Sequence, residues 1–265
     1  MRKVLPPMFI ALVLFVIYAP ILILAAYSLT DATTIGSLGG FSFQNYVKLF
    51  TTPELASMIG GTVLLALVSS ILATILGTLG AVGIYYSKNR VQAVANTVNQ
   101  VPVVNADVVT GFSICILLVV AFGISKDTYI PLILGHVTLS APFVYLSVVP
   151  KLKAMDQSLY EAALDLGASP AYALRKVIMP QIMSGVVSGF ALAITLSLDD
   201  YFIATYTKPA TFDTISTYVV NATRGSQTEI KTALWALSTI IFLIVLAVAI
   251  VMSLTHNDGG KGEKA

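Results

Sequence analysis

Long apolar runs constrain this chain more than any other feature. A helix needs about 20 predominantly apolar residues to cross the hydrocarbon core of a bilayer. Six stretches meet this requirement: Leu5–Leu29, Ile59–Tyr86, Val98–Gly123, Tyr129–Val149, Ile182–Tyr206 and Thr232–Leu254. Charged residues make up only 11% of the chain, against about 25% in soluble domains. The sequence therefore predicts an all-α, polytopic membrane protein with six transmembrane helices.

The first apolar run has two possible interpretations. It follows Arg2 and Lys3, as the core of a secretory signal peptide would. However, it is longer than the 7–15 apolar residues of such a core, and Pro20 lies inside it. We therefore expect a retained first helix, with a cleaved signal peptide as the alternative.

Orientation follows from the basic residues of the loops, which are enriched on the cytoplasmic side. With the N-terminus inside, the cytoplasmic side holds Arg2, Lys3, Lys88, Arg90, Lys151, Lys153, Arg175, Lys176, Lys261 and Lys264. The outer side holds Lys48, Lys126, Lys208, Arg224 and Lys231. This distribution predicts that both termini are cytoplasmic, in agreement with an even number of spans.

Two predicted outer loops, residues 30–58 and 207–231, combine aromatic and polar residues. They could form a docking surface for an extracytoplasmic partner. Alternatively, their aromatic side chains lie at the level of the lipid headgroups. The net charge of +2 is too small to indicate a nucleic-acid partner.

The predicted cytoplasmic loop between the fourth and fifth spans, about residues 150–181, is far longer than a turn requires. Ser158 and Glu161 have the spacing of a capping box, which predicts that a helix begins there. Gly167 is a candidate helix end, and Ser169-Pro170 is a typical helix start. A second helix then extends to Pro180. We expect two short helices joined at a glycine, and an interfacial hairpin without a partner is the alternative.

The same loop resembles the EAA loop of ABC importer permeases. The resemblance rests on Glu161-Ala162-Ala163, then Gly167, then Val177-Ile178-Met179-Pro180. Val177 and Met179 depart conservatively from the pattern. In that family the loop forms coupling helices that insert into a groove of a cytoplasmic ATPase. The resemblance implies that Glu161, Ala162, Ala163 and Gly167 contact the ATPase here.

By the same resemblance, residues 1–256 form one permease domain with the coupling loop at about 150–181. Residues 257–265 are polar and glycine-rich and are expected to be a flexible tail. The chain has no Gly-x-x-x-x-Gly-Lys-Ser/Thr motif. The resemblance therefore places ATP and Mg on a partner ATPase dimer, and the chain itself has no catalytic residues and needs no cofactor.

Three carboxylates fall inside the predicted spans: Asp107, Asp199 and Asp200. An aspartate at the bilayer centre costs about 2.5–3.5 kcal/mol on insertion scales, so such residues usually face a cavity or a partner. Asp107 lies in a segment interrupted by Pro102 and Gly111, which favours a broken helix that lines a cavity. The three aspartates are candidate residues of a substrate pathway. Polar packing between helices is the alternative.

No Lys or Arg lies in the core of a span to neutralise these acids, so a cationic substrate such as a polyamine is favoured. A metal ion fits less well. His136 and His256 are isolated and no metal-ligand spacing occurs, so no metal site is predicted. His136 is expected to be a packed or interfacial residue.

Ser197-Leu-Asp-Asp200, together with the 161–169 and 175–178 segments, resembles the C-type permease of spermidine/putrescine importers. The resemblance implies a bacterial inner-membrane complex of this chain, a second permease, two ATPase subunits and a substrate-binding protein. Other substrates of the same class of importer, such as an anion, an iron chelate or an opine, remain open. A proton-coupled secondary transporter and an intramembrane enzyme are the alternatives outside that class.

Overall fold

The computed structural model describes residues 5–32, 39–156, 158–224, 232–243 and 246. The described residues are helical apart from turns, connections and an isolated β-bridge between Thr30 and Phe41. The chain divides into two compact units, residues 58–218 and residues 1–57 with 219–265. This helical architecture confirms the all-α prediction.

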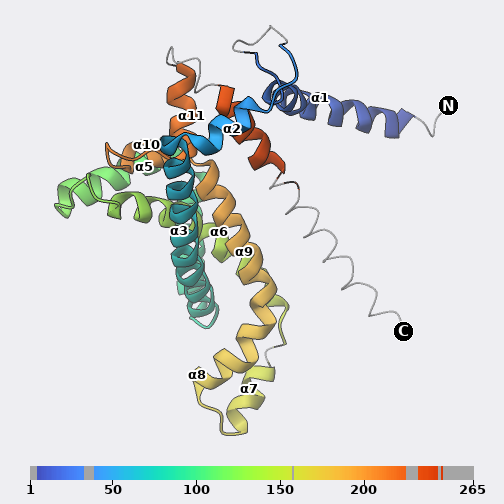
Figure 1. Ribbon diagram of the computed structural model, residues 1–265. Helices are drawn as coiled ribbons and strands as arrows, with labels where there is room; N and C mark the ends of the chain where they lie inside the picture. Colours follow the sequence, from blue (N-terminus) through green and yellow to red (C-terminus); the bar gives the residue numbers. More distant parts are fainter. Residues whose placement is uncertain (1–4, 33–38, 157, 225–231, 244–245, 247–265) are drawn as a thin grey trace. The chain divides into compact units, whose positions relative to one another are not determined.

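The larger unit contains the elements that form the site, and Figure 1 labels most of them. In chain order they are α3 (Pro53–Tyr85), α4 (Asn89–Val104), α5 (Asp107–Ile116), the π-helical η1 (Leu117–Ala121), α6 (Ile130–Ala154), α7 (Ser158–Asp165), α8 (Pro170–Ala173), the π-helical η2 (Leu174–Ile178), α9 (Met179–Asp199), α10 (Phe202–Thr207) and α11 (Ile215–Arg224). Helices α3 and α11 each extend across a boundary between the two units.

Helices α6 and α9 form the most extensive contact of this unit. Val144, Val148 and Leu152 of α6 are fully buried in one apolar cluster with Ile182 of α9. Close approach depends on glycine, because a Cβ at Gly189 would lie 3.1 Å from Cα of Val144. Small residues at helix contacts are typical of membrane proteins, where association depends on packing.

The contact between α3 and α6 gives a matched test of this packing. A Cβ at Gly77 would lie 2.7 Å from Cβ of Val144 and 2.8 Å from the backbone oxygen of Ala141, whereas a Cβ at Gly80 would meet nothing within 4 Å. Overpacking of this kind costs about 1–3 kcal/mol. Gly77→Ala is therefore expected to lower the apparent Tm of the purified protein in detergent. Gly80→Ala on the same helix should leave it unchanged or raise it slightly, since alanine favours a helix over glycine, and equal effects of the two variants would contradict the packing.

Four described helices are long and apolar enough to cross a membrane: Met8–Ser28, Pro53–Tyr85, Ile130–Ala154 and Pro170–Asp199. The pair Asn89–Val104 and Asp107–Ala121 passes the same test together and is bent by 106°. Of the sixth predicted span, the structure describes Thr232–Leu243 as a shorter apolar helix. Most of its remainder, like the tail at 257–265, lies outside the described residues, so the number of six spans stays a prediction.

The third predicted span is a broken helix, as its proline and glycine predicted. Asn105 and Ala106 are extended, with ψ of 146° and 134°, and they separate α4 from α5. The Asn105 side chain donates a hydrogen bond to the hydroxyl of Thr110 in the first turn of α5. The break therefore has local polar contacts that hold it, as expected for irregular backbone at membrane depth.

The ends of the fifth predicted span differ from the expectation. The helix does not run to Tyr206, because Asp200 is extended and a new helix, α10, begins at Phe202. At its other end Pro180 does not stop the preceding helix. The π-helical turn η2 precedes it, and Pro170–Asp199 forms one continuous 30-residue helix. A π-turn widens the helix, which lets the proline ring be accommodated.

The smaller unit contains α1 (Leu5–Ser28), α2 (Gln44–Thr51) and the Thr232–Leu243 helix. The predicted first helix is present, and Pro20 does not interrupt it. The buried Asn45 side chain donates to the carbonyl oxygens of Ser28 and Thr30 at the end of α1. The ring of Trp235 packs edge-on against Tyr27.

Candidate functional site

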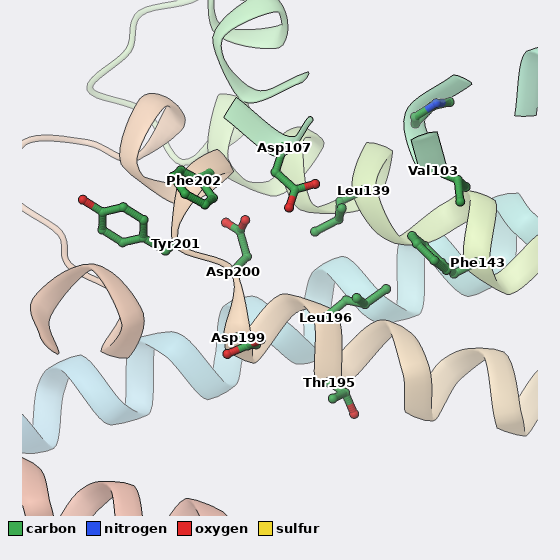
Figure 2. Close-up of a pocket in the computed structure, with 11 residues that line it drawn as sticks. Val103, Asp107, Leu139, Phe143, Thr195, Leu196, Asp199, Asp200, Tyr201 and Phe202 are labelled. Carbon is green, nitrogen blue, oxygen red and sulfur yellow. The ribbon is translucent and has the colours of Figure 1, made fainter. Parts of the chain in front are cut away.

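The three intramembrane aspartates lie around one cavity in the larger unit. The cavity has a volume of about 420 Å³. It is lined by Pro102, Val103, Asp107, Leu139, Phe143, Thr195, Leu196, Asp199, Asp200, Tyr201 and Phe202, most of which Figure 2 labels. The sequence could not place Asp107 beside the other two, since more than 90 residues separate them. The bend before α5 and the end of α9 bring them together.

Two of the aspartates are exposed in this cavity. Asp107 is the first residue of α5 and Asp199 is the last residue of α9. The described contacts include no hydrogen bond or ion pair to either side chain. In Figure 2 the carboxylates of Asp107 and Asp200 point toward a common space, and that of Asp199 points away from them. Each of the exposed pair is free to accept a cation.

Asp200 is in a different situation. It is only 8% exposed. Its Oδ1 accepts from the backbone N–H of Ile203 at 3.2 Å, and its Oδ2 accepts from that of Ala204 at 2.7 Å. These N–H groups belong to the first turn of α10, so the carboxylate caps that turn from the residue that precedes the N-cap position, Tyr201. Asp200 thus holds the beginning of α10.

His136 of α6 is fully buried beside Asp200, so of the two expectations, a packed or an interfacial histidine, the packed one is confirmed. Its Nδ1 lies 2.8 Å from the hydroxyl oxygen of Ser197 and its Nε2 lies 3.6 Å from Oδ2 of Asp200. The Ser197 hydroxyl is also 3.1 Å from that of Ser69 on α3. Ser197 lies in the last turn of α9, and Asp200 is the extended residue that follows this helix. Only the structure reveals that His136 lies beside both residues.

The lining of the cavity contains no Lys or Arg. Its other large side chains are apolar or aromatic: Leu139, Phe143, Leu196, Tyr201 and Phe202. In the part of the chain that the structure describes, no group of three or more His, Cys, Asp or Glu could hold a metal ion. The site therefore combines carboxylates with apolar walls, a combination that suits an organic cation with an aliphatic chain.

The predicted coupling loop is a helical hairpin. Its first helix, α7, ends at Asp165, and the turn that follows contains Gly167. Gly167 has φ of +86°, in the left-handed region that favours glycine. Its N–H donates to the carbonyl oxygen of Leu164, and the N–H of Ala168 donates to that of Ala163. These two hydrogen bonds form a Schellman motif, which satisfies the last carbonyl groups of α7. The prediction that the helix stops at Gly167 is confirmed.

The starts of the two hairpin helices are capped by different residues. The hydroxyl of Ser169 accepts from the N–H of Tyr172, which confirms the predicted start of α8. The capping box at Ser158 is wrong, because Ser158 is already the first residue of α7. Its N–H donates to the carboxylate of Asp156 instead. Hydrogen bonds from the Ser158 hydroxyl and then from its N–H lower the pKa of the Asp156 carboxyl.

The tip of the hairpin presents a surface that the chain itself does not cover. Glu161 and Ala162 are exposed, Ala163 is half-buried, and Leu166 is 90% exposed. A hollow of about 520 Å³ is lined by Ala163, Leu166, Gly167, Ala168, Ser169 and Tyr172. Leu166, Ala163 and Gly167 thus line a hollow that is open to the surroundings.

The hairpin and the cavity lie at opposite ends of one helix. The continuous segment from Pro170 to Asp199 starts in the hairpin and ends in the cavity lining. Figure 1 shows α7 and α8 at one end of α9 and α10 at the other. Thirty helical residues extend over about 45 Å. The hairpin and Asp199 are therefore joined by one continuous helical segment.

Comparison with known proteins identifies similar chains. Residues 73–257 match the family described as binding-protein-dependent transport system inner membrane component. The spermidine/putrescine transport system permease protein PotC of Haemophilus influenzae is 31% identical over 91% of this chain and 93% of its own length. The putrescine transport system permease protein PotI of Escherichia coli K12 is 33% identical, over 85% of this chain and 81% of its own length.

Solved structures agree on the fold. A chain of a bacterial ABC transporter involved in the import of the acidic polysaccharide alginate superposes with a TM-score of 0.73. It is 20% identical, and the match covers 96% of each chain. A chain of a bacterial alginate ABC transporter in complex with an alginate pentasaccharide-bound periplasmic protein gives a TM-score of 0.71 at 17% identity, over 95% of this chain and 94% of the other.

Proposed function

The chain belongs to the family of binding-protein-dependent transport system inner membrane components, and from that premise we propose that it is the permease subunit of an ATP-driven polyamine importer. It is a multi-pass membrane protein and a non-catalytic transport subunit. The observation that carries the substrate class is the cavity in which Asp107, Asp199 and Asp200 meet with no Lys or Arg among them.

A polyamine matches this cavity in both charge and shape. Its ammonium groups would face the exposed carboxylates of Asp107 and Asp199, which have no described partner of their own. Its methylene groups would lie against Phe143 and Leu139, and aromatic faces such as that of Phe202 also attract organic cations. The named substrates of the similar PotC and PotI chains, spermidine and putrescine, support this choice.

The continuous helix supports a mechanism in which movement at the hairpin opens and closes the cavity. A partner ATPase would hold the exposed surface around Glu161, Ala162, Ala163 and Gly167 and displace it when ATP binds. The helix from Pro170 would carry that displacement to Asp199. The cavity would then face alternately outward and inward.

One chain of this size provides only part of a translocation pathway. We place a second permease chain opposite the cavity, a dimer of ATPases at the hairpin, and an extracytoplasmic binding protein on the other side. Both termini would then be cytoplasmic, as the distribution of basic residues predicts. The hairpin carries Arg175 and Lys176, which suits a cytoplasmic position.

The test is reconstitution of the chain in nanodiscs with its ATPase, second permease and binding protein. We expect spermidine or putrescine on the binding protein to stimulate ATP hydrolysis severalfold, and a neutral sugar or an acidic oligosaccharide to have no effect. If an anion, an iron chelate or an opine stimulated ATP hydrolysis instead of polyamines, the chain would still be an ABC importer permease, but the proposed polyamine substrate would be wrong.

A proton-coupled secondary transporter remains the alternative outside the class, because buried carboxylates also relay protons. Uptake into cells separates the two mechanisms. The ATP-driven importer should stop when ATP is depleted and continue when a protonophore removes the proton gradient at constant ATP. The reverse result would contradict the ATPase-coupled function.

A further inference from the structure

The buried His136 lies at the centre of a polar chain that joins three helices. Ser69 of α3, Ser197 of α9 and His136 of α6 follow one another at hydrogen-bond distance, and Asp200 lies beyond the imidazole ring. None of these four residues is more than 8% exposed. Buried polar groups are costly unless they satisfy one another, so this series of polar side chains needs a structural or functional reason.

The position of the ring proton of His136 can be assigned from the groups that surround the ring. If Nδ1 of His136 carried the only ring proton, the bare nitrogen Nε2 would face the Asp200 carboxylate at 3.6 Å, which is repulsive. We therefore assign the neutral ring with its proton on Nε2. Nδ1 then accepts from the Ser197 hydroxyl at 2.8 Å. The Ser69 hydroxyl donates to the backbone oxygen of Leu65 and lies 3.1 Å from that of Ser197. The donors of Ser197 and His136 then both point toward Asp200.

At 3.6 Å the contact between Nε2 and Asp200 is longer than a hydrogen bond, and Nε2 has no other described partner. It acts as an oriented dipole on a carboxylate whose two oxygens already accept from Ile203 and Ala204. Asp200 is thus held both by the backbone N–H groups of α10 and by the His136 ring. The side chains of Asp107 and Asp199 have no such contacts among the described residues.

We propose that Asp107 and Asp199 contact the transported cation, whereas Asp200 is a positioning residue that His136, Ser197 and Ser69 hold in place as the cap of α10. The division rests on the proposed function for its substrate. In Figure 2, Asp200 lies in the turn between Asp199 and the start of α10, where Tyr201 and Phe202 follow it into the lining. Loss of the cap would therefore displace two aromatic walls as well as Asp199.

The competing view is that all three carboxylates bind the cation directly. The two views differ in what Asp200→Asn does. Asparagine is as favourable at helix N-caps as aspartate, and its one oxygen can keep the 2.7 Å bond to Ala204 while the 3.2 Å bond to Ile203 is lost. A positioning role therefore loses part of the cap but no cation contact, so KM changes little, whereas a charge contact raises KM. Asp199→Asn is the matched control, because it removes the adjacent charge without removing a cap.

The first arm measures putrescine uptake by the reconstituted complex. We expect Asp199→Asn to raise KM about tenfold, the effect of losing one modest charge contact. Asp200→Asn should change KM by less than about twofold. Asp200→Leu and His136→Leu should lower the maximal rate and raise KM severalfold, because loss of the cap displaces Asp199 and the aromatic walls, and His136→Gln, which retains a donor toward Asp200, should restore both. An equal rise in KM for Asp199→Asn and Asp200→Asn would overturn the division of roles.

The second arm needs no substrate. The apparent Tm of the purified complex is measured for His136→Leu, Asp200→Leu and the double variant. Residues that act through one another give non-additive effects, so the double variant should lose less than the sum of the single losses. The pair His136→Leu and Asp199→Leu should be additive. Additive losses for His136 and Asp200 would overturn the positioning role. A complex that transports no polyamine would refute the proposed substrate and still leave this arm decisive.

Discussion

Gly167→Pro is expected to abolish ATP-driven uptake while the membrane-embedded part of the chain still folds. Proline fixes φ near −65° and has no N–H. Gly167 has φ of +86° and donates its N–H to Leu164, so proline would destroy both features of the turn. A Cβ at this position meets nothing within 4 Å, so the effect comes from the backbone and not from a clash.

Gly167→Ala should give a graded version of the same defect. A left-handed conformation costs a non-glycine residue about 1–2 kcal/mol. The population of the correctly formed hairpin, and with it the yield of co-purified ATPase, should fall by about 5- to 30-fold if the hairpin is only marginally stable. The measurement is the ratio of ATPase to permease after purification, together with the rate of uptake.

Gly123 provides the matched control for this prediction. It also has a positive φ, of +66°, and a Cβ there also meets nothing within 4 Å. It lies between η1 and α6, outside the hairpin. Gly123→Ala should therefore leave the ATPase bound. Uptake at the normal rate by the Gly167→Pro variant would remove the basis for a coupling hairpin. The charge reversal Glu161→Lys on the exposed face of α7 should also release the ATPase.

The combined variant Asp107→Asn/Asp199→Asn is expected to lose polyamine uptake almost completely. The carboxylate of Asp199 points away from that of Asp107 in Figure 2, so we expect each to face a different ammonium group. The two losses should then be independent, and their fold-changes in KM should multiply. With about tenfold for each charge, the double variant should show KM raised by about a hundredfold.

Asp127→Asn is the control for this variant, since Asp127 is an exposed aspartate in the connection between η1 and α6 and does not line the cavity. It should transport normally. Each asparagine variant should also assemble with its partners in normal yield, because neither Asp107 nor Asp199 has a described structural bond. A double variant with an unaltered KM would mean that the cation takes another route.

The fold class and the coupling hairpin were predictable because their signals are local in the sequence. An apolar run of 20 residues specifies a membrane helix wherever it packs. A glycine at a helix end and a serine before a proline are decided by the φ angle and the hydrogen bonds of their own neighbours. Gly167 and Ser169 were therefore placed correctly, whereas the start of α7 was displaced because a second acceptor, Asp156, precedes Ser158.

The breaks of the two interrupted spans were harder to locate. Pro102 and Gly111 indicated an interruption, but the bend lies at Asn105 and Ala106. Pro180 indicated a helix end, and the helix instead continues through a π-turn. A proline in the sequence shows only that one backbone hydrogen bond of the helix is missing. Whether the helix bends or widens at that point depends on how it packs against neighbouring helices.

The sequence by itself determined that this chain is a helical membrane protein, that a helical hairpin follows its fourth predicted span, and that three acids lie within its predicted spans. Only the tertiary structure decided that these acids share a cavity, that Asp200 is already bonded, and that His136 lies behind it. Composition and turn signals depend on a few consecutive residues, and they can be read along the chain. The environment of a buried polar group depends on contacts between α3, α6 and α9, and those are fixed only when the helices pack.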